Sequence, residues 1–277
     1  MILNLVAVAQ HLETQVRAFT DLAVVGVSGG IDSAVVAAIC VKALGRDNVH
    51  LVSMPYDEVD LASFNARSLE LANRLGAEHH VVSVGAMSSL VEDAMADVFD
   101  DDLHRLTRAN VRPRVRMNVL YSICGELGFR TSRRARVMGT GHLSEDLIGY
   151  DTKGGDALCD IFILADLVKS EVYQLADHYG VPASIIQAVP SAGLYQGQTD
   201  EQELGHTYAA LEAPTLVLHR LLRDETPIEQ ISASMPAFAG IERELAEFVV
   251  KRYKLNFHKH EAPATVSSRR TEWFEPD

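Results

Sequence analysis

One short segment near the amino terminus restricts the possible folds more than any other. Residues 22–27 form an apolar, valine-rich run, residues 28–33 read Ser-Gly-Gly-Ile-Asp-Ser, and residues 34–43 are apolar and end before Gly45. A short apolar run of this kind is typical of a strand buried on both faces. A glycine-rich turn between such a strand and an apolar helix is typical of a parallel α/β unit. We therefore expect a strand, a tight turn and a helix here.

The same alternation of strand and helix continues along the chain. Further strands are expected at residues 50–55, 78–84 and 136–139, and helices at residues 3–19, 61–75, 86–99, 111–127 and 167–179. Strands separated by helices of this length form βαβ units, in which the strands are parallel and the helices cover the sheet. The expected fold class is therefore α/β, with a doubly wound parallel sheet and flanking helices.

The later part of the chain is expected to be a helical C-terminal region with two irregular segments before it. Residues 150–160 lack periodicity and are predicted to be a mobile loop, and residues 190–205 are predicted to be irregular. Helices are expected at residues 207–223, 227–234 and 239–254. We expect a single domain over residues 1–260, followed by a polar tail over residues 261–277.

Composition excludes several classes of protein. The formal net charge of −13 disfavours nucleic acid and anionic membranes as partners, because both are negatively charged. No apolar run reaches the roughly 18 residues of a membrane-spanning helix, and no signal peptide is evident. Cys40, Cys124 and Cys159 are odd in number and form no C-x-x-C pair, which disfavours a disulfide framework or structural zinc. A cytoplasmic protein is expected.

The glycine-rich turn has the residue types of a polyphosphate site. Gly29 and Gly30 let backbone N–H groups approach an anion, and the following helix directs its positive end to the same place. Ser28 and Ser33 add hydroxyl groups, and Asp32 is a hard oxygen ligand suited to Mg²⁺. The alternative to a polyphosphate site is an ordinary Gly/Ser turn capped by Asp32. A G-x-G-x-x-G motif, typical of dinucleotide binding, is absent. A Walker A lysine is also absent, which favours attack on the α-phosphate of ATP with release of pyrophosphate.

The octet at residues 26–33 resembles the PP-loop of the ATP-pyrophosphatase superfamily, whose fold is adenine nucleotide alpha hydrolase-like. Later segments, in the same order along the chain, resemble sequence blocks of the ammonia-dependent NAD synthetases. These segments are residues 114–118, 139–145, 149–153, 166–172, 190–194, 197–201 and 258–259. Taken together, the blocks cover nearly the whole chain and are far more specific than the octet alone.

The resemblance implies an activity and a set of partners. Such enzymes join nicotinic acid adenine dinucleotide, ATP and ammonia through an acyl-adenylate, with Mg²⁺, to give NAD, AMP and pyrophosphate. The family also implies a homodimer, for which the apolar faces of residues 3–19 and 111–127 are candidate interfaces, although both could equally belong to the core. No glutaminase domain precedes the PP-loop, so free ammonia is the expected nitrogen source.

Residue roles are carried over from the same resemblance. The ATP-binding residues would be Gly26, Ser28, Gly29, Gly30, Asp32, Ser33, Thr140, Lys169 and Ser191. Asp32 and Lys169 would be catalytic, and Asp32 and Glu145 would hold the metal. The dinucleotide would be bound by Arg114, Lys153, Asp160, His258 and Lys259.

The chain departs from the family pattern in one loop and one helix. Residues 154–159 lack the aromatic residue of the family loop and place Ala157 and Leu158 where glycines are usual, and Pro113 replaces an alanine. Three alternatives therefore stay open: a paralogue that amidates another carboxylate, another PP-loop enzyme such as a GMP synthetase or tRNA thiolase, and a nucleotide-binding module without turnover. His142 is interpreted as a hydrogen-bonded histidine, and Cys159 as a small filler.

Overall fold

The computed structural model describes residues 2–99, 103–191, 199–259 and 261, without the side chains of residues 58–65. Five parallel strands form one sheet in the order β3-β2-β1-β4-β5. The strands are β1 (Leu22–Gly26), β2 (Val49–Ser53), β3 (Glu78–Val81), β4 (Ala135–His142) and β5 (Ile161–Leu164). The chain runs outward from β1 to β3, then crosses to β4 and β5 on the other side of β1. This order confirms the doubly wound parallel sheet.

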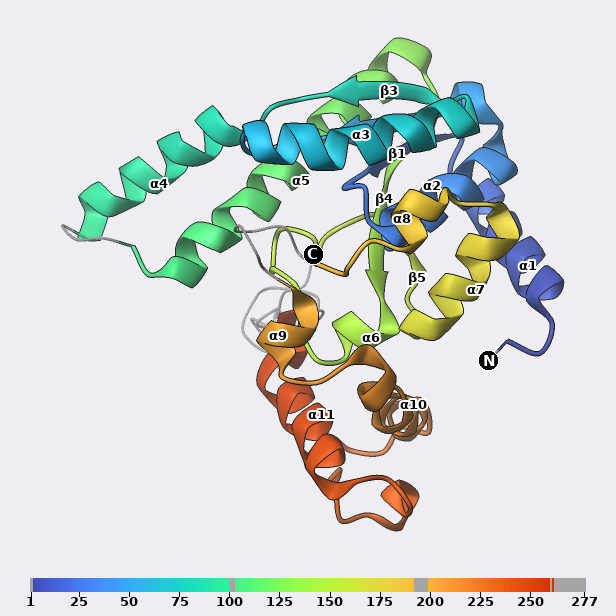
Figure 1. Cartoon of the computed structure of the whole chain (residues 1–277), viewed down its shortest axis with the longest axis vertical. Helices are drawn as coiled ribbons and strands as arrows, with labels where there is room; N and C mark the ends of the chain where they lie inside the picture. Colours follow the sequence, from blue (N-terminus) through green and yellow to red (C-terminus); the bar gives the residue numbers. More distant parts are fainter. Residues whose placement is uncertain (1, 100–102, 192–198, 260, 262–277) are drawn as a thin grey trace, which may run out of the picture.

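Helices lie on both faces of the sheet and beyond one end of it (Figure 1). The α-helices are α1 (Leu5–Phe19), α2 (Ile31–Leu44), α3 (Glu58–Leu75), α4 (Gly85–Phe99), α5 (Arg105–Thr131), α6 (Leu143–Asp146), α7 (Lys169–Tyr179), α8 (Ala183–Ile186), α9 (Asp200–Leu204), α10 (Tyr208–Arg223) and α11 (Arg243–Asn256). The 3-10 turns are η1 (Arg46–Asn48), η2 (Pro236–Phe238) and η3 (Phe257–Lys259). In the described part of the chain, no helix is long and apolar enough to cross a membrane.

The central strand is buried on both sides because its residues alternate between two cores. Ala23 and Val25 pack with α1, α2 and α7, whereas Leu22 and Val24 pack with α5. Helix α2 is apolar around most of its surface and is almost wholly buried between α1, α7 and the sheet. The candidate interface faces of residues 3–19 and 111–127 therefore contribute to these two cores.

A third core joins the C-terminal helices. Leu147 and Ile148, just after α6, pack against Leu211 and Leu218 of α10 and Val249 of α11. These helices lie beyond the carboxyl end of β4, where the chain leaves the sheet (Figure 1). The C-terminal helical region therefore closes over the edge of the sheet at which ligands bind in doubly wound folds.

One sequence expectation outside the sheet holds and one needs correction. Residues 150–160 contain no helix or strand, as expected, and form turns in which Thr152 O accepts from the N–H groups of Gly155 and Ala157, and Thr152 N–H donates to Asp156; their mobility stays a prediction. Residues 227–234 were expected to be a helix, which is wrong: they form turns that begin with a bond from Gln230 N–H to Pro227 O.

Other expectations were incomplete. Strand β5 and helix α9 lie where no regular element was expected, and α5 begins before residue 111 and continues through Pro113. Except for residue 261, the predicted polar tail lies outside the described residues.

Candidate functional site

The PP-loop connects β1 to α2 at the point where the strand order reverses. Gly29 adopts a left-handed conformation with φ of +76°, which a residue with a Cβ rarely takes. Ser28 and Ser33 brace the loop: Ser33 Oγ donates to Gly30 O at 3.1 Å, and Gly30 N–H donates to Ser28 Oγ at 3.2 Å. Gly30 caps α2 without a side chain, so the first N–H groups of α2 are available to an anion.

A buried lysine meets the aspartate of this loop. Lys169 begins α7, and its Nζ lies 2.8 Å from both carboxylate oxygens of Asp32. The Lys169 side chain is 5% exposed and that of Asp32 is 21% exposed. Burial opposes the lysine charge, but Asp32 and Glu145 outweigh it and raise the pKa of Lys169 above its usual value. Lys169 is therefore a fixed cation at the start of α2.

His142 and Glu145 extend the same cluster from the end of β4. His142 is fully buried, and its Nε2 lies 3.2 Å from Lys169 Nζ, 3.4 Å from Glu145 Oε1 and 3.5 Å from Asp32 Oδ1. Burial would lower the pKa of His142, but Glu145 raises it above the usual value. Burial would raise the pKa of Glu145, but His142 and then Lys169 lower it to about 2. The carboxylates of Asp32 and Glu145 converge beside His142 and could hold a cation.

The C-terminal helices complete the cluster through a tyrosine. The hydroxyl of Tyr208, in α10, lies 3.3 Å from Glu145 Oε1 and 3.1 Å from Asp200 Oδ2, and its ring lies 5.2 Å from Lys169 Nζ. Tyr150 donates to Glu203 at 2.7 Å and lies 3.3 Å from the other oxygen of Asp200. The sequence analysis assigned Glu145 and Lys169 to the site but not Tyr208, Asp200, Tyr150 or Glu203. Asp200 could have been found, because it belongs to one of the quoted family blocks.

The protonation of Asp200 predicts that the stability of the protein depends on pH. Burial, followed by the charge of Glu145, raises the pKa of Asp200 from 3.8 to about 6. Between pH 4 and pH 6, the Asp200 carboxyl of the unfolded chain has lost its proton, whereas that of the folded chain has kept it. The free energy of unfolding therefore falls as pH rises from about 4 to 6.

Asp200→Asn removes this loss of stability, because asparagine does not titrate. The variant should gain stability over the wild type, by up to about 3 kcal/mol above pH 6.

Urea unfolding of the wild type and Asp200→Asn at pH 4.5 and pH 7.5 checks this expectation. The difference in unfolding free energy should be larger at the higher pH. An equal difference at both values would mean that Asp200 titrates normally in the folded protein.

The other ATP-binding candidates lie around the same edge of the sheet or just outside it. A Cβ on Gly26 would lie 3.2 Å from Leu120, so glycine here allows α5 to pack closely under the loop. Thr140 lies in the carboxyl half of β4. Ser191 is exposed and ends the described segment that follows α8. The structure therefore brings Thr140 to the edge that carries the loop, whereas Ser191 adjoins residues that are not described.

The dinucleotide-binding candidates form a second group, built from three distant segments. Arg114 Nε donates to Lys153 O at 3.2 Å, and Lys153 Nζ donates to His258 O at 2.6 Å. Lys259 Nζ donates to Gly149 O at 2.6 Å and to a second carbonyl nearby. The structure therefore brings Arg114, Lys153, His258 and Lys259 together, at the junction of α5, the 150–160 turns and η3.

The loop of residues 154–159 packs against Pro113, the departure from the family pattern in α5. A Cβ added to Gly155 would lie 2.8 Å from Pro113 Cβ and 3.0 Å from its carbonyl carbon. Pro113 is buried inside α5, so this close approach is possible only because residue 155 has no side chain. Gly155, which follows the family pattern, therefore allows the loop to approach Pro113 closely.

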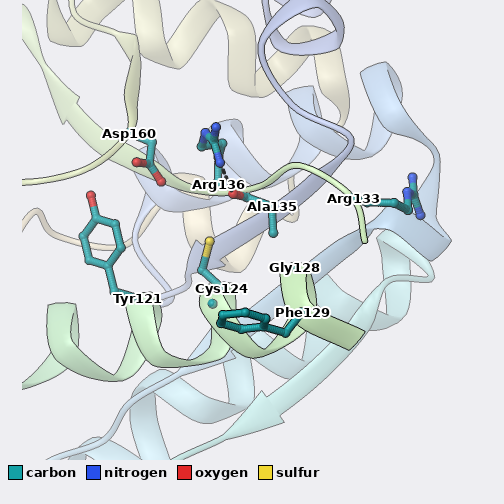
Figure 2. A pocket seen from close by; sticks show the side chains of 9 residues that line it. Tyr121, Cys124, Gly128, Phe129, Arg133, Ala135, Arg136 and Asp160 are labelled. Atoms are coloured by element: carbon teal, nitrogen blue, oxygen red, sulfur yellow. Dashed lines mark hydrogen bonds between the residues drawn. The ribbon is translucent and has the colours of Figure 1, made fainter. Parts of the chain in front are cut away.

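Asp160 lies apart from the cluster of Asp32, Lys169 and His142. Its carboxylate accepts the N–H of Val137 at 2.7 Å, five residues before His142 and so about 16 Å from it along β4. Asp160 lines an open pocket of about 410 Å³ on the α5 side of the sheet, together with Tyr121, Cys124 and Arg136 (Figure 2). The pocket therefore combines one carboxylate with an arginine and an aromatic wall.

The cysteine thiols of this region are expected to be unreactive in the folded protein. Burial raises the pKa of Cys124 to about 11 and that of Cys159 to about 12, and Cys159 packs against Gly139. Because the thiolate is the nucleophile, both should react with Ellman's reagent at pH 8 roughly 100-fold or more slowly than free cysteine. The rates of reaction with Ellman's reagent, measured with and without guanidinium, check this prediction. A thiol of the native protein that reacts like free cysteine would contradict it.

Known proteins share this fold, and some are similar to this chain in sequence along most of its length. A family model described as NAD synthase matches residues 5–263. An NH3-dependent NAD(+) synthetase of Methanococcoides burtonii is 36% identical over 253 residues, covering 91% of this chain and 90% of the relative. The structure of an NMN synthetase from Francisella tularensis has a TM-score of 0.70 and 28% identity, covering 94% of this chain and 97% of its own. An NH3-dependent NAD synthetase from Campylobacter jejuni shares the fold, with a TM-score of 0.66 and 23% identity, covering 94% of this chain and 98% of its own.

Proposed function

This chain belongs to the NAD synthase family, and we propose that it amidates nicotinic acid adenine dinucleotide with ATP and ammonia. The nicotinate carboxylate of the dinucleotide attacks the α-phosphorus of ATP, and pyrophosphate leaves. Ammonia then attacks the carbonyl carbon of the acyl-adenylate, and AMP leaves with the bonding electrons. The observation that supports this function most strongly is the buried Lys169–Asp32 pair at the open amino end of α2.

The PP-loop residues fix the outer phosphates of ATP. The free N–H groups at the start of α2 bind the β- and γ-phosphates as one unit, and the hydroxyls of Ser28 and Ser33 assist. Lys169 neutralises negative charge that develops as pyrophosphate leaves. Gly26 keeps the loop close to α5, and Thr140 and Ser191 bind the remainder of ATP through their hydroxyls.

Asp32 and Glu145 would hold Mg²⁺. The donor set fits, because two charged carboxylates converge in a partly buried site and oxygen is the ligand that Mg²⁺ prefers. When bound there, Mg²⁺ supplies charge neutralisation on the phosphates. Tyr208 orients Glu145 by hydrogen bonding, and Asp32 also anchors Lys169.

The dinucleotide is bound by the second group of residues. Arg114, Lys153 and Lys259 present cations to its pyrophosphate and to the nicotinate carboxylate, and His258 lies beside them. Asp160 serves the other part of the substrate from its pocket, where Arg133 and Arg136 offer further positive charge. Residues 1–260 act as one domain in this scheme, because the PP-loop, the 150–160 turns and η3 all contribute to one site.

An end-point assay tests the proposed function. Purified protein is mixed with ATP, Mg²⁺, ammonium and nicotinic acid adenine dinucleotide, and NAD, AMP and pyrophosphate are quantified. NAD and AMP should form in equal amounts. The matched reaction contains nicotinic acid mononucleotide, because the Francisella tularensis relative is an NMN synthetase. Amidation of the mononucleotide alone, or no AMP from folded protein with either substrate, would overturn the proposal.

We also propose that the enzyme is a cytoplasmic homodimer. Leu90, Val98 and Phe99 of α4 and Leu106 of α5 are each more than half exposed, and α4 extends away from the sheet (Figure 1). An apolar surface of this kind is typical of an interface between subunits. The free cysteines support a reducing compartment. Light scattering should give twice the chain mass of 30.4 kDa, and a mass of one chain would contradict the dimer.

A further inference from the structure

Two outer strands bring three side chains with metal-binding groups to one face of the sheet. In the parallel pair β2–β3, His50 lies opposite Glu78 and Val52 lies opposite His80. Paired residues, and residues two apart on a strand, point to the same face. Val52 belongs to the core beneath α5, so His50, Glu78 and His80 also lie on the α5 side. His79 points to the opposite face, where its Nε2 lies 2.8 Å from Ser53 Oγ.

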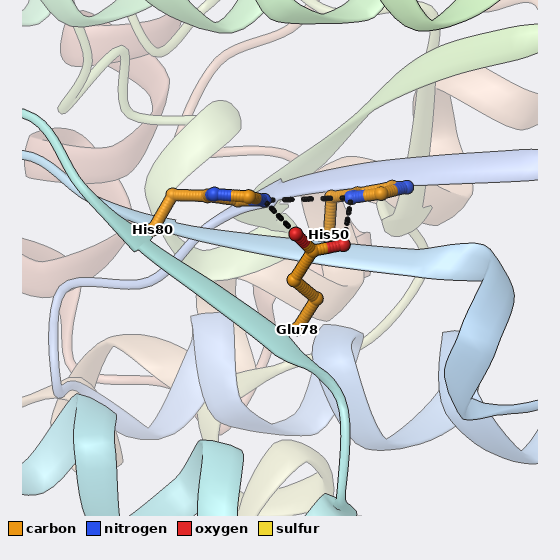
Figure 3. A group of neighbouring side chains, drawn as sticks. All are labelled: His50, Glu78 and His80. Carbon is orange, nitrogen blue, oxygen red and sulfur yellow. Dashed lines mark hydrogen bonds and ion pairs between the residues drawn. The ribbon is translucent and has the colours of Figure 1, made fainter.

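The donor atoms of these side chains converge (Figure 3). Glu78 Oε2 lies 3.2 Å from His50 Nδ1, Glu78 Oε1 lies 3.5 Å from His80 Nε2, and the two ring nitrogens lie 3.5 Å apart. In a tetrahedral zinc site with bonds of about 2.0–2.1 Å, neighbouring ligand atoms are about 3.3–3.4 Å apart. The separation of the two ring nitrogens and that of each nitrogen from its nearer Glu78 oxygen are therefore close to those between ligands of one tetrahedral ion. When one oxygen of Glu78 serves as the ligand, the three ligand atoms lie within 4.8 Å of one another.

The exposure of the cluster suits an ion that enters from solvent. The side chain of His50 is 12% exposed, that of His80 is 36% exposed and that of Glu78 is 61% exposed. Water can therefore reach the cluster and supply the fourth ligand.

The geometry points to a site for a divalent transition metal, of which Zn²⁺ is the best match, formed by His50, Glu78 and His80. Two imidazoles and one carboxylate favour Zn²⁺ over Mg²⁺, which prefers oxygen ligands. The site is separate from the nucleotide-binding cluster, because it lies on the two outer strands and His50 is near the start of β2. A bound ion would cross-link the edge strand β3 to β2 and so stabilise this side of the sheet.

Calorimetric titration of the full chain with zinc chloride, after treatment with a chelator, tests this site. We expect saturable binding that includes one site lost in His80→Gln, for which the affinity falls by roughly 100-fold, because one ligand has been removed. His79→Gln is the matched control, since it changes the neighbouring histidine on the other face. In thermal unfolding, Zn²⁺ should raise the midpoint of the wild type and of His79→Gln but not that of His80→Gln.

A second variant separates this site from the nucleotide cluster, which could also take Zn²⁺. Glu145→Gln alters that cluster and should leave the zinc-dependent rise in the midpoint unchanged. The proposal would be overturned if Zn²⁺ no longer raised the unfolding midpoint of Glu145→Gln but still raised that of His80→Gln. Equal zinc affinity in His80→Gln and His79→Gln would also overturn it, provided that circular dichroism shows both variants folded.

Discussion

Asp32→Ala is expected to abolish AMP formation, a loss of more than about 1,000-fold in turnover, in a protein that remains folded. Asp32 is bonded through both oxygens to Lys169, and it is one of the two carboxylates proposed to hold Mg²⁺. Removing it leaves Lys169 without the partner that fixes its position and leaves the metal with one carboxylate. Release of labelled AMP from ATP, measured at saturating ATP and dinucleotide, checks this result.

Asp47→Ala is the matched control for that variant. Asp47 follows α2 rather than starting it, and its side chain is 90% exposed. Its removal should leave turnover within a small factor of the wild type. Normal AMP formation by Asp32→Ala would remove this residue from the mechanism, and the proposed metal site would then have to be abandoned.

Lys169→Ala is expected to reduce both turnover and stability. Turnover should fall by about 100- to 1,000-fold, because a fixed positive charge at the phosphates is lost. The free energy of unfolding should fall by about 3 kcal/mol, since Asp32 and Glu145 are left without the lysine that compensates their charges. Added Mg²⁺ should restore part of this stability, because it binds the same carboxylates. Urea unfolding with and without Mg²⁺ measures both effects.

Lys42→Ala provides the comparison, since Lys42 is an exposed residue near the end of α2. It should change neither turnover nor unfolding. A Lys169→Ala variant as stable as Lys42→Ala would contradict the account of Lys169 as the buried counter-ion of Asp32.

The sequence was sufficient for the first part of the fold because its signals are local. An apolar run, a glycine turn and an apolar helix follow one another at residues 22–44, and the structure has β1 and α2 there. Strand β5 was missed because it is only four residues long and follows a segment without periodicity. The helix expected at residues 227–234 does not form, although the local pattern favoured it, because Pro227 begins a turn instead.

The site was less accessible from sequence because its members are far apart in the chain. Asp32 and Lys169 are 137 residues apart and meet only because β1 and α7 belong to the same doubly wound layer arrangement. The family resemblance named both residues, but no spacing could have shown that they touch. His142 was interpreted as a hydrogen-bonded histidine, and it is one, but the sequence did not indicate that it lies at the centre of the charged cluster. Tyr208 carried no signal, because a single tyrosine at the start of a helix is usual in any core.

The central claim is that the substrate carboxylate attacks the α-phosphorus of ATP, and isotope transfer tests it most directly. The nicotinate carboxylate of the dinucleotide is labelled with oxygen-18, and the products are analysed by mass spectrometry after one turnover. AMP should carry one labelled oxygen, because the oxygen that attacks phosphorus stays on it when ammonia takes the carbonyl carbon. Unlabelled AMP, or label in pyrophosphate, would contradict the acyl-adenylate and the site roles proposed for Asp32 and Lys169.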